Sequence, residues 1–212
     1  MATLLRIGIC FLPVLTLFLL SRRFVPAFQV SEGFVAVLSG LASVIPVVLI
    51  QQGIRLLLNL AGAEASYAFT CFVSSSFVEE SVKAGVLAAV FRKKPSFLVF
   101  CAAAVLAGFS FGGFEAVLYL FSGGGNTLLR LVTAVALHGF CALLGGFTVW
   151  TLYGGGFRFS SLLPLVFAVL LHGLYNFFAG ISGGLQWFSL VCIAAAVNQC
   201  VVYYRKLTIQ NL

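Results

Sequence analysis

SYAFTCFVSSSFVEESVKAGVLAAVF, residues 66–91, decides the fold, because this segment is long and apolar enough to cross a membrane and yet carries charge. A helix needs about 20 mainly apolar residues to span the hydrocarbon core of a bilayer. Glu79, Glu80 and Lys83 lie inside the segment. A charged side chain at the bilayer centre costs about 2.5–3.5 kcal/mol on insertion scales, so charges at that depth indicate a partner, a water-filled cavity or a chemical task. This cluster is therefore the first candidate for a functional site.

The composition of the whole chain indicates an integral membrane protein. Of its 212 residues, 62% are hydrophobic and 8% are charged, whereas soluble domains have about 45–50% apolar and about 25% charged residues. We expect an all-α fold, a transmembrane helical bundle that forms one domain over residues 1–212. Its seven expected spans are approximately residues 3–20, 34–52, 66–91, 96–121, 128–153, 160–180 and 185–204, with residues 53–65 either lengthening the second helix or lying at the membrane interface.

The basic residues lie in short connectors and predict an orientation. The connectors after the first, third and fifth spans, together with the tail, hold eight Lys and Arg residues, among them Arg92, Lys93 and Lys94, and the opposite side holds three. The positive-inside rule then places the C-terminus in the cytoplasm and the N-terminus outside. It also accounts for the net charge of +7 without a nucleic-acid partner. We expect a multi-pass protein of the cell membrane, with a first span that is retained because the basic pair Arg22-Arg23 follows it.

The other polar residues within the spans fall at helical spacings from one another. Residues three and four apart share a helix face, so Lys83 can pair with Glu79 or with Glu80, and the other carboxylate remains for chemistry. His172 and Asn176 share a face of the sixth span, and Phe111 and Glu115 share a face of the fourth. The fifth span contributes His138, and these two histidines are the only ones in the chain.

Three of these polar groups lie at similar estimated depths in the membrane. At a rise of about 1.5 Å per residue, Glu80 and His172 lie roughly 18 Å and His138 roughly 22 Å from the cytoplasmic ends of their spans. Glu115 lies nearer the outer face, at roughly 28 Å, unless Gly108, Gly112 and Gly113 bend or shift its helix. We therefore expect Glu80, His138 and His172 to meet in one pocket.

Two kinds of hydrolysis suit this set of residues. A carboxylate in a cavity of low dielectric can exchange a proton near neutral pH, and an amide such as that of Asn176 can donate to an oxyanion. Alternatively, His138, His172 and Glu80 make the ligand set of a hydrolytic metal site, with Zn²⁺ the favoured ion and the second carboxylate left as base. The spacing is not of the H-E-x-x-H type, so a metal is a hypothesis.

Four short motifs in order along the chain resemble a known family. Glu79-Glu80-Ser81-Val82-Lys83 matches E-E-x-x-K, and Phe111 to Glu115 matches F-x-x-x-E. His138 with Gly145, and His172 with Asn176, complete the order. The chain thus resembles the PrsW family of intramembrane proteases, related to the CAAX prenyl endopeptidase and bacteriocin-processing superfamily, and the resemblance covers residues 66–180, the expected catalytic core.

The resemblance implies cleavage of membrane-anchored proteins with a single span, such as anti-sigma factors. It implies that Glu79 and Glu80 are the catalytic pair and that His138 and His172 bind a metal or stabilise the transition state. Asn176 would assist at the oxyanion. Members of the family are classed as metalloproteases or as glutamate proteases, so both mechanisms stay open; we choose Glu80 as the base and Glu79 as the partner of Lys83, and the two roles can be exchanged.

Two other classes of function remain. Buried Glu, His and Lys also build the proton relays of ion-coupled transporters, although transporters usually contain repeats of whole halves. An inactive scaffold would keep the fold and the motifs without cleaving anything. Loss of substrate cleavage in a Glu80→Gln variant that still assembles would indicate the protease.

Overall fold

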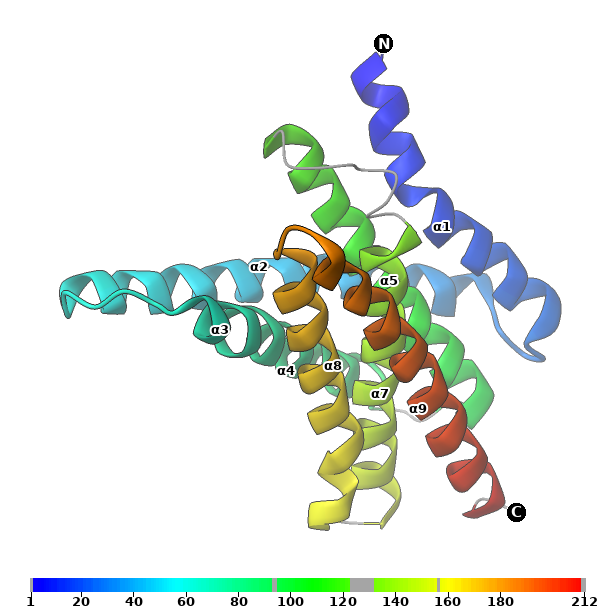
Figure 1. The fold of residues 1–212 in the computed structure, drawn as a ribbon. Helices are drawn as coiled ribbons and strands as arrows, with labels where there is room; N and C mark the ends of the chain where they lie inside the picture. Colours follow the sequence, from blue (N-terminus) through cyan, green and yellow to red (C-terminus); the bar gives the residue numbers. More distant parts are fainter. Residues whose placement is uncertain (1, 93–94, 123–131, 156, 211–212) are drawn as a thin grey trace.

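The structure, a computed structural model, describes residues 2–92, 95–122, 132–155 and 157–210, and within these ranges every regular element is a helix. Figure 1 follows the chain from α1 to α9. The elements, in order, are α1 (Ala2–Phe24), α2 (Val30–Leu60), α3 (Tyr67–Phe69), the π-helix η1 (Thr70–Phe77), α4 (Val78–Val90), α5 (Phe97–Ser122), α7 (Ala134–Gly155), the short 3₁₀ helix η2 (Phe159–Leu162), α8 (Leu163–Ala179), the 3₁₀ helix η3 (Gly184–Trp187) and α9 (Phe188–Gln210). The expected all-α bundle is confirmed.

Six helical segments of the described chain are long and apolar enough to cross a membrane. They comprise α1, α2, α5, α7, η2 with α8, and η3 with α9. The third expected span is present as the continuous helical segment α3–η1–α4, but it carries Glu79, Glu80 and Lys83 and is not one of the six. A seven-span topology and its orientation therefore stay predictions. Lys93, Lys94 and the start of the expected span 128–153 lie outside the described residues.

The second helix is longer than expected. It runs without interruption from Val30 to Leu60, so most of the ambiguous segment 53–65 lengthens it. At a rise of about 1.5 Å per residue, a helix of 31 residues is about 46 Å long, against a hydrocarbon core of about 30 Å. Its far end therefore extends beyond what a span needs, and its polar residues Gln51 and Arg55 belong to that end.

α5 is the centre of the bundle, since it packs against α1, α2 and α7. α4 in turn packs against α2 and α7, and α8 packs against η1, α7 and α9. In Figure 1 α2 runs across the direction of α5, α7, α8 and α9. As a result, the charged segment α3–η1–α4 lies among α2, α7 and α8, and the polar residues of all these helices can meet.

Two glycines allow α5 and α7 to pack with their backbones close together. A Cβ atom at Gly108 would overlap the backbone carbonyl of His138, and a Cβ at Gly112 would lie 2.9 Å from the ring atom Cδ2 of His138 and 3.0 Å from Cα of Val135. Small residues permit such close approach between membrane helices. The sequence left open whether these glycines bend or shift α5; in the structure they make room for His138.

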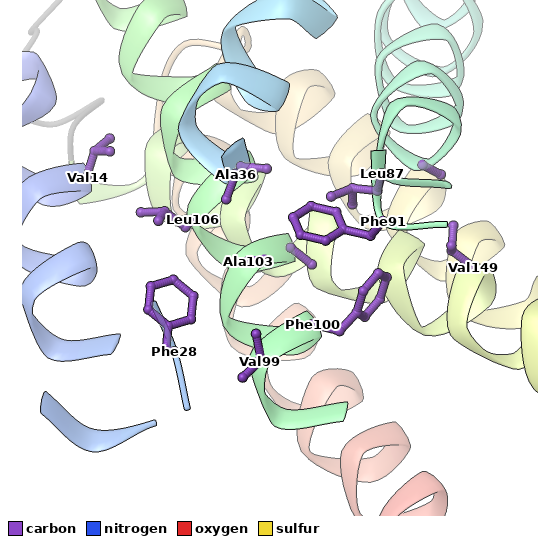
Figure 2. Packing of buried hydrophobic residues seen from close by; sticks show 13 residues of the cluster. Val14, Phe28, Ala36, Leu87, Phe91, Val99, Phe100, Ala103, Leu106 and Val149 are labelled. Carbon is purple, nitrogen blue, oxygen red and sulfur yellow. The ribbon is translucent and has the colours of Figure 1, made fainter. Parts of the chain in front are cut away.

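A hydrophobic core closes one side of the charged cluster. It joins α1, α2, α4, α5 and α7, and Figure 2 shows its packing around Leu87, Phe91 and Phe100. Its members on α4 follow Glu79 and Glu80 in the sequence, and its members on α5 precede Phe111 and Glu115. The core therefore lies toward the end of α4 and the start of α5, to one side of the polar residues.

Candidate active site

A π-helix leads directly into the two glutamates. η1 covers Thr70–Phe77, and within it the Ser76 hydroxyl donates to the carbonyl of Cys71, five residues earlier, at 2.7 Å. π-Helical turns are rare and occur frequently at functional sites. α4 begins at Val78, so Glu79 and Glu80 lie in its first turn, where both are buried.

One carboxylate oxygen of Glu80 contacts both Lys83 and His172. Its Oε1 atom lies 2.7 Å from Nζ of Lys83 and 2.7 Å from Nδ1 of His172. All three side chains are at most 3% exposed. The structure thus selects Glu80, not Glu79, as the ion-pair partner of Lys83, and our choice of Glu79 for this pair is wrong. The spacing of four and that of three both fit a helix face, so the sequence alone did not separate them.

Glu79 has one satisfied oxygen and one oxygen that faces the histidines. Oε1 accepts hydrogen bonds from Ser75, at 2.9 Å, and from Nε2 of Gln51, at 3.2 Å. Oε2 is buried and has no hydrogen-bond partner among the described residues. It lies 4.0 Å from Nδ1 of His138 and 3.8 Å from Nε2 of His172. Glu79 is therefore held by one oxygen and presents the other to both imidazoles.

His138 is held by the carboxylate of α5. Its Nε2 atom lies 2.6 Å from Oε2 of Glu115, and its Nδ1 atom lies 3.3 Å from Nζ of Lys83. The Phe111 ring packs against both groups, with its centroid 5.2 Å from that of His138 and 4.9 Å from Nζ of Lys83. Glu115 thus belongs to the same cluster as the other glutamates, although the depth estimate separated it from them.

Asn176 takes part in the cluster through another side chain. Its Nδ2 atom donates to Oγ of Ser75 at 3.1 Å, and Ser75 in turn donates to Glu79. In this arrangement Asn176 positions Ser75, and its expected role at an oxyanion stays a prediction. The structure brings together every residue that the sequence singled out, namely Glu79, Glu80, Lys83, Phe111, Glu115, His138, His172 and Asn176.

Two contacts of Glu79 were missed by the sequence reasoning. Gln51 comes from α2, outside the expected core of residues 66–180, and Ser75 is one of three successive serines. The polar pair Gln51-Gln52 at the end of an apolar stretch was the available signal for Gln51. Nothing in the run Ser74-Ser75-Ser76 distinguishes the serine that contacts Glu79.

Glu79, His138 and His172 form a group that can bind a metal ion. One ligand atom of each lies within 4.8 Å of the others, and all three are buried. Ligands of a tetrahedral zinc ion with bonds of about 2.0–2.1 Å lie about 3.4 Å apart, so small shifts would complete the shell. The carboxylate in this group is Glu79, whereas the sequence reasoning placed Glu80 there.

The surroundings of the three residues fit such an ion. Each imidazole has one nitrogen against a carboxylate, His138 against Glu115 and His172 against Glu80, and metal-binding histidines are usually held in this way. The other nitrogen of His172 faces Glu79, whereas that of His138 also lies 3.3 Å from Nζ of Lys83, so a bound metal would replace this contact. The carboxyl groups of Glu79, Glu80 and Glu115 outnumber the single ammonium of Lys83 in this cluster, so its formal charge is negative. A buried divalent cation would balance that charge.

Two cavities meet at Glu79. The polar cavity, of about 670 Å³, extends from Glu79 and Ser75 along the end of α2 to the exposed Glu64. The apolar cavity, of about 270 Å³, lies between α2 and α5. Four residues line both, namely Gln51, Glu79, Glu115 and Tyr119. Glu80 lines neither cavity. Water can therefore reach Glu79 and Glu115 through a polar space.

The fold and the site together define a class of protein. A bundle of apolar helices holds buried carboxylates and imidazoles, and a polar cavity leads to them. Two histidines and a carboxylate are a donor set found in hydrolytic metal centres. Together these features are typical of a membrane-embedded metallohydrolase. A family model described as PrsW family intramembrane metalloprotease matches residues 33–202. The match covers most of the chain, and the chain belongs to this family of membrane proteases. Comparisons with curated proteins and with solved structures gave no match.

Proposed function

We propose that this protein is an intramembrane endopeptidase that hydrolyses a peptide bond in membrane-anchored proteins. The observation that carries the proposal is the Oε2 atom of Glu79, which is buried, lacks a hydrogen-bond partner in the described chain and faces two imidazoles. A buried carboxylate oxygen without a partner is costly. Such an atom is retained where a water molecule, a metal or a substrate completes its coordination.

The family description includes a metal, and the residues of this site fit one. Glu79, His138 and His172 would hold the ion, Zn²⁺ being favoured by two nitrogen donors and one oxygen donor. A bound divalent ion would supply an activated water and polarise the carbonyl of the scissile bond. Glu80 and Glu115 would keep the two imidazoles in the orientation that binding needs.

The chain's own groups divide the remaining work among themselves. With a metal bound, Glu79 would hold the ion where the two cavities meet, whereas Glu80 orients His172 and neutralises Lys83. We thus exchange the two roles that we first assigned. If the protein works without a metal, Oε2 of Glu79 takes the proton of the water, and the imidazole of His138 or His172 stabilises the oxyanion.

The substrate that we propose is a protein anchored by one transmembrane segment, for instance a regulator of the anti-sigma-factor type. The membrane that we propose is the cell membrane, with the C-terminus in the cytoplasm as the distribution of Lys and Arg predicts. The relation of the family to the CAAX prenyl endopeptidases stays a prediction. The family match favours a protease over the transporter, and the cleavage assay separates the protease from the scaffold.

The proposal is tested with purified protein in lipid vesicles and a panel of synthetic single-span peptides. We expect fragments with the unchanged protein and with Glu64→Gln, which alters an exposed carboxylate of the polar cavity. We expect none with Glu79→Gln. Ion flux across the vesicle membrane without any cleaved peptide would indicate the transporter, and full cleavage by Glu79→Gln would exclude the proposed site.

Elemental analysis of the same preparations separates the two mechanisms. We expect about one divalent ion per chain in the unchanged protein and much less in Glu79→Gln, because removal of a ligand weakens binding more than the 10–100-fold typical of an orienting group. Activity that survives chelators in protein without stoichiometric metal would leave the glutamate mechanism.

A further inference from the structure

One face of α2 and one face of α5 line most of the apolar cavity. Val44, Val47 and Val48 line it from α2, and Phe111, Phe114 and Leu118 line it from α5. Each set follows the helical spacing of three and four residues. On α2 the same face continues to Gln51, and on α5 Glu115 lies between Phe114 and Leu118. The apolar side chains of the cavity therefore adjoin the carboxylates of the catalytic cluster.

The lining of this cavity suits an apolar group better than water. Its volume is about 270 Å³, several times the roughly 30 Å³ that one water molecule occupies in the liquid. Six of its ten lining residues are Val, Leu or Phe, whose side chains offer a water molecule no hydrogen bonds. A large apolar group is therefore the occupant that suits most of this lining.

The cavity also has an edge on the outer surface of the bundle. Val47 and Phe111 are buried and form its floor, whereas Val48 is 40% exposed and Leu118 is 46% exposed at its rim. In a bilayer such apolar rim residues face hydrocarbon. A segment arriving from the lipid can therefore place a side chain in the cavity while water reaches Glu79 through the polar cavity.

We infer that the apolar cavity is the subsite for a large apolar side chain of the substrate, next to the peptide bond that is cleaved. This inference rests on the proposed proteolytic function. The occupant is a Leu- or Phe-sized side chain, because the cavity has a volume of about 270 Å³ and is lined by Val, Phe and Leu. With that side chain in the cavity, the adjoining backbone carbonyl would face the cluster at Glu79. Val48 and Phe114 then determine how large the side chain can be.

The test varies one residue of a peptide and one residue of the protein. The peptides are single-span segments in lipid vesicles, with Ala, Leu, Phe or Trp next to the cleaved bond identified by mass spectrometry. Val48→Phe should reduce cleavage of the Leu and Phe peptides at least 10-fold and leave the Ala peptide within about 2-fold. Leu49→Phe, on the exposed side of the same helix, should change neither.

A second variant enlarges the cavity. Phe114→Ala should move the preference toward Trp, so that the ratio of Trp to Leu cleavage rises several-fold. If all peptides are cleaved and neither Val48→Phe nor Phe114→Ala changes the ranking, the subsite is elsewhere and the proposed function is unaffected.

A binding measurement tests the subsite separately from the cleavage rates. A photoreactive phenylalanine analogue at the same peptide position should crosslink to residues 44–48 and 111–118 of the Glu79→Gln protein, and excess Leu peptide should suppress the crosslink while excess Ala peptide should not. Crosslinks to the cavity together with cleavage by the unchanged protein would support the subsite, whereas crosslinks without any cleavage would overturn the proposed function and the subsite with it. Crosslinks spread over all lipid-facing helices, or suppressed equally by added phospholipid, would overturn the subsite.

Discussion

Nδ1 of His172 and Oε1 of Glu80 lie 2.7 Å apart, and the two residues are 92 positions apart in the chain. The same oxygen lies 2.7 Å from Nζ of Lys83. Both carboxylate contacts are buried. Glu80 is therefore the residue that ties α4 to α8, and its removal has consequences for stability as well as for the site.

The first prediction concerns this tie. Glu80→Gln leaves the ammonium of Lys83 buried without a counter-charge, and the loss of one partner of a buried pair costs about 3–5 kcal/mol. We expect a lower unfolding temperature in detergent and little or no cleavage. Glu80→Gln combined with Lys83→Met should regain much of the stability, because the unpaired charge is gone, but should stay inactive since His172 has lost its carboxylate. Equal stability of the single and double variants would contradict this account.

The second prediction concerns Glu79. Glu79→Gln keeps the shape of the side chain, and its amide oxygen can still accept from Ser75 and Gln51. We expect a stability close to that of the unchanged protein with a loss of activity of at least 100-fold, because the oxygen facing the imidazoles is replaced. The cleavage rate and the unfolding temperature, measured on one preparation, check both parts. A large drop in stability would indicate that Glu79 has a structural role instead.

The third prediction concerns Gln51, which donates to Glu79 from α2. A hydrogen bond to a charged group contributes about 1.5–3 kcal/mol, so Gln51→Ala should lower kcat about 10-fold or more through misplacement of Glu79. Gln52→Ala changes the neighbouring exposed residue and should have no effect. Gln51→Glu should be worse than Gln51→Ala because it places a like charge beside Glu79. Identical rates for the Gln51 and Gln52 variants would remove Gln51 from the site.

The fourth prediction concerns the contact between α5 and α7. Gly112→Ala places a methyl group 2.9 Å from the His138 ring, and such overpacking costs about 1–3 kcal/mol. We expect lower stability and a displaced His138, hence weaker metal binding and slower cleavage. Gly85→Ala is the matched control, since no atom lies within 4 Å of the added Cβ and the residue is exposed on a helix. There the change should be neutral or stabilising by up to about 1 kcal/mol.

Much of the fold and the composition of the site could be predicted because both depend on local patterns. A long apolar segment indicates a membrane-spanning helix, and a charged residue inside such a helix indicates a functional site. Which carboxylate meets Lys83 could not be predicted, since spacings of three and four fit an α-helix equally well. The contribution of Gln51 depends on the packing of α2 beside α4, which is a relation in space that no spacing along the chain encodes.

The position of Glu115 illustrates a further limit. Counting residues from a helix end assumes that every helix stands upright and starts at the same level. Figure 1 shows that α2 runs across several of its neighbours, so depth in sequence and position in space differ from helix to helix. Glu115 lies 2.6 Å from His138 although the count placed the two at different depths.

The hydrophobic core around Leu87, Phe91 and Phe100 (Figure 2) also has a consequence for the membrane as an electrical insulator. The polar cavity brings solvent to Glu79 along α2, whereas the core fills the space between α4, α5 and α7 beyond the glutamates. Titratable groups reached by water from both sides would conduct protons and dissipate the gradient across the membrane. The packed apolar side chains of this core would oppose a water path from Glu79 toward the end of α4, and hydrolysis inside the bilayer would then leave the membrane closed to protons.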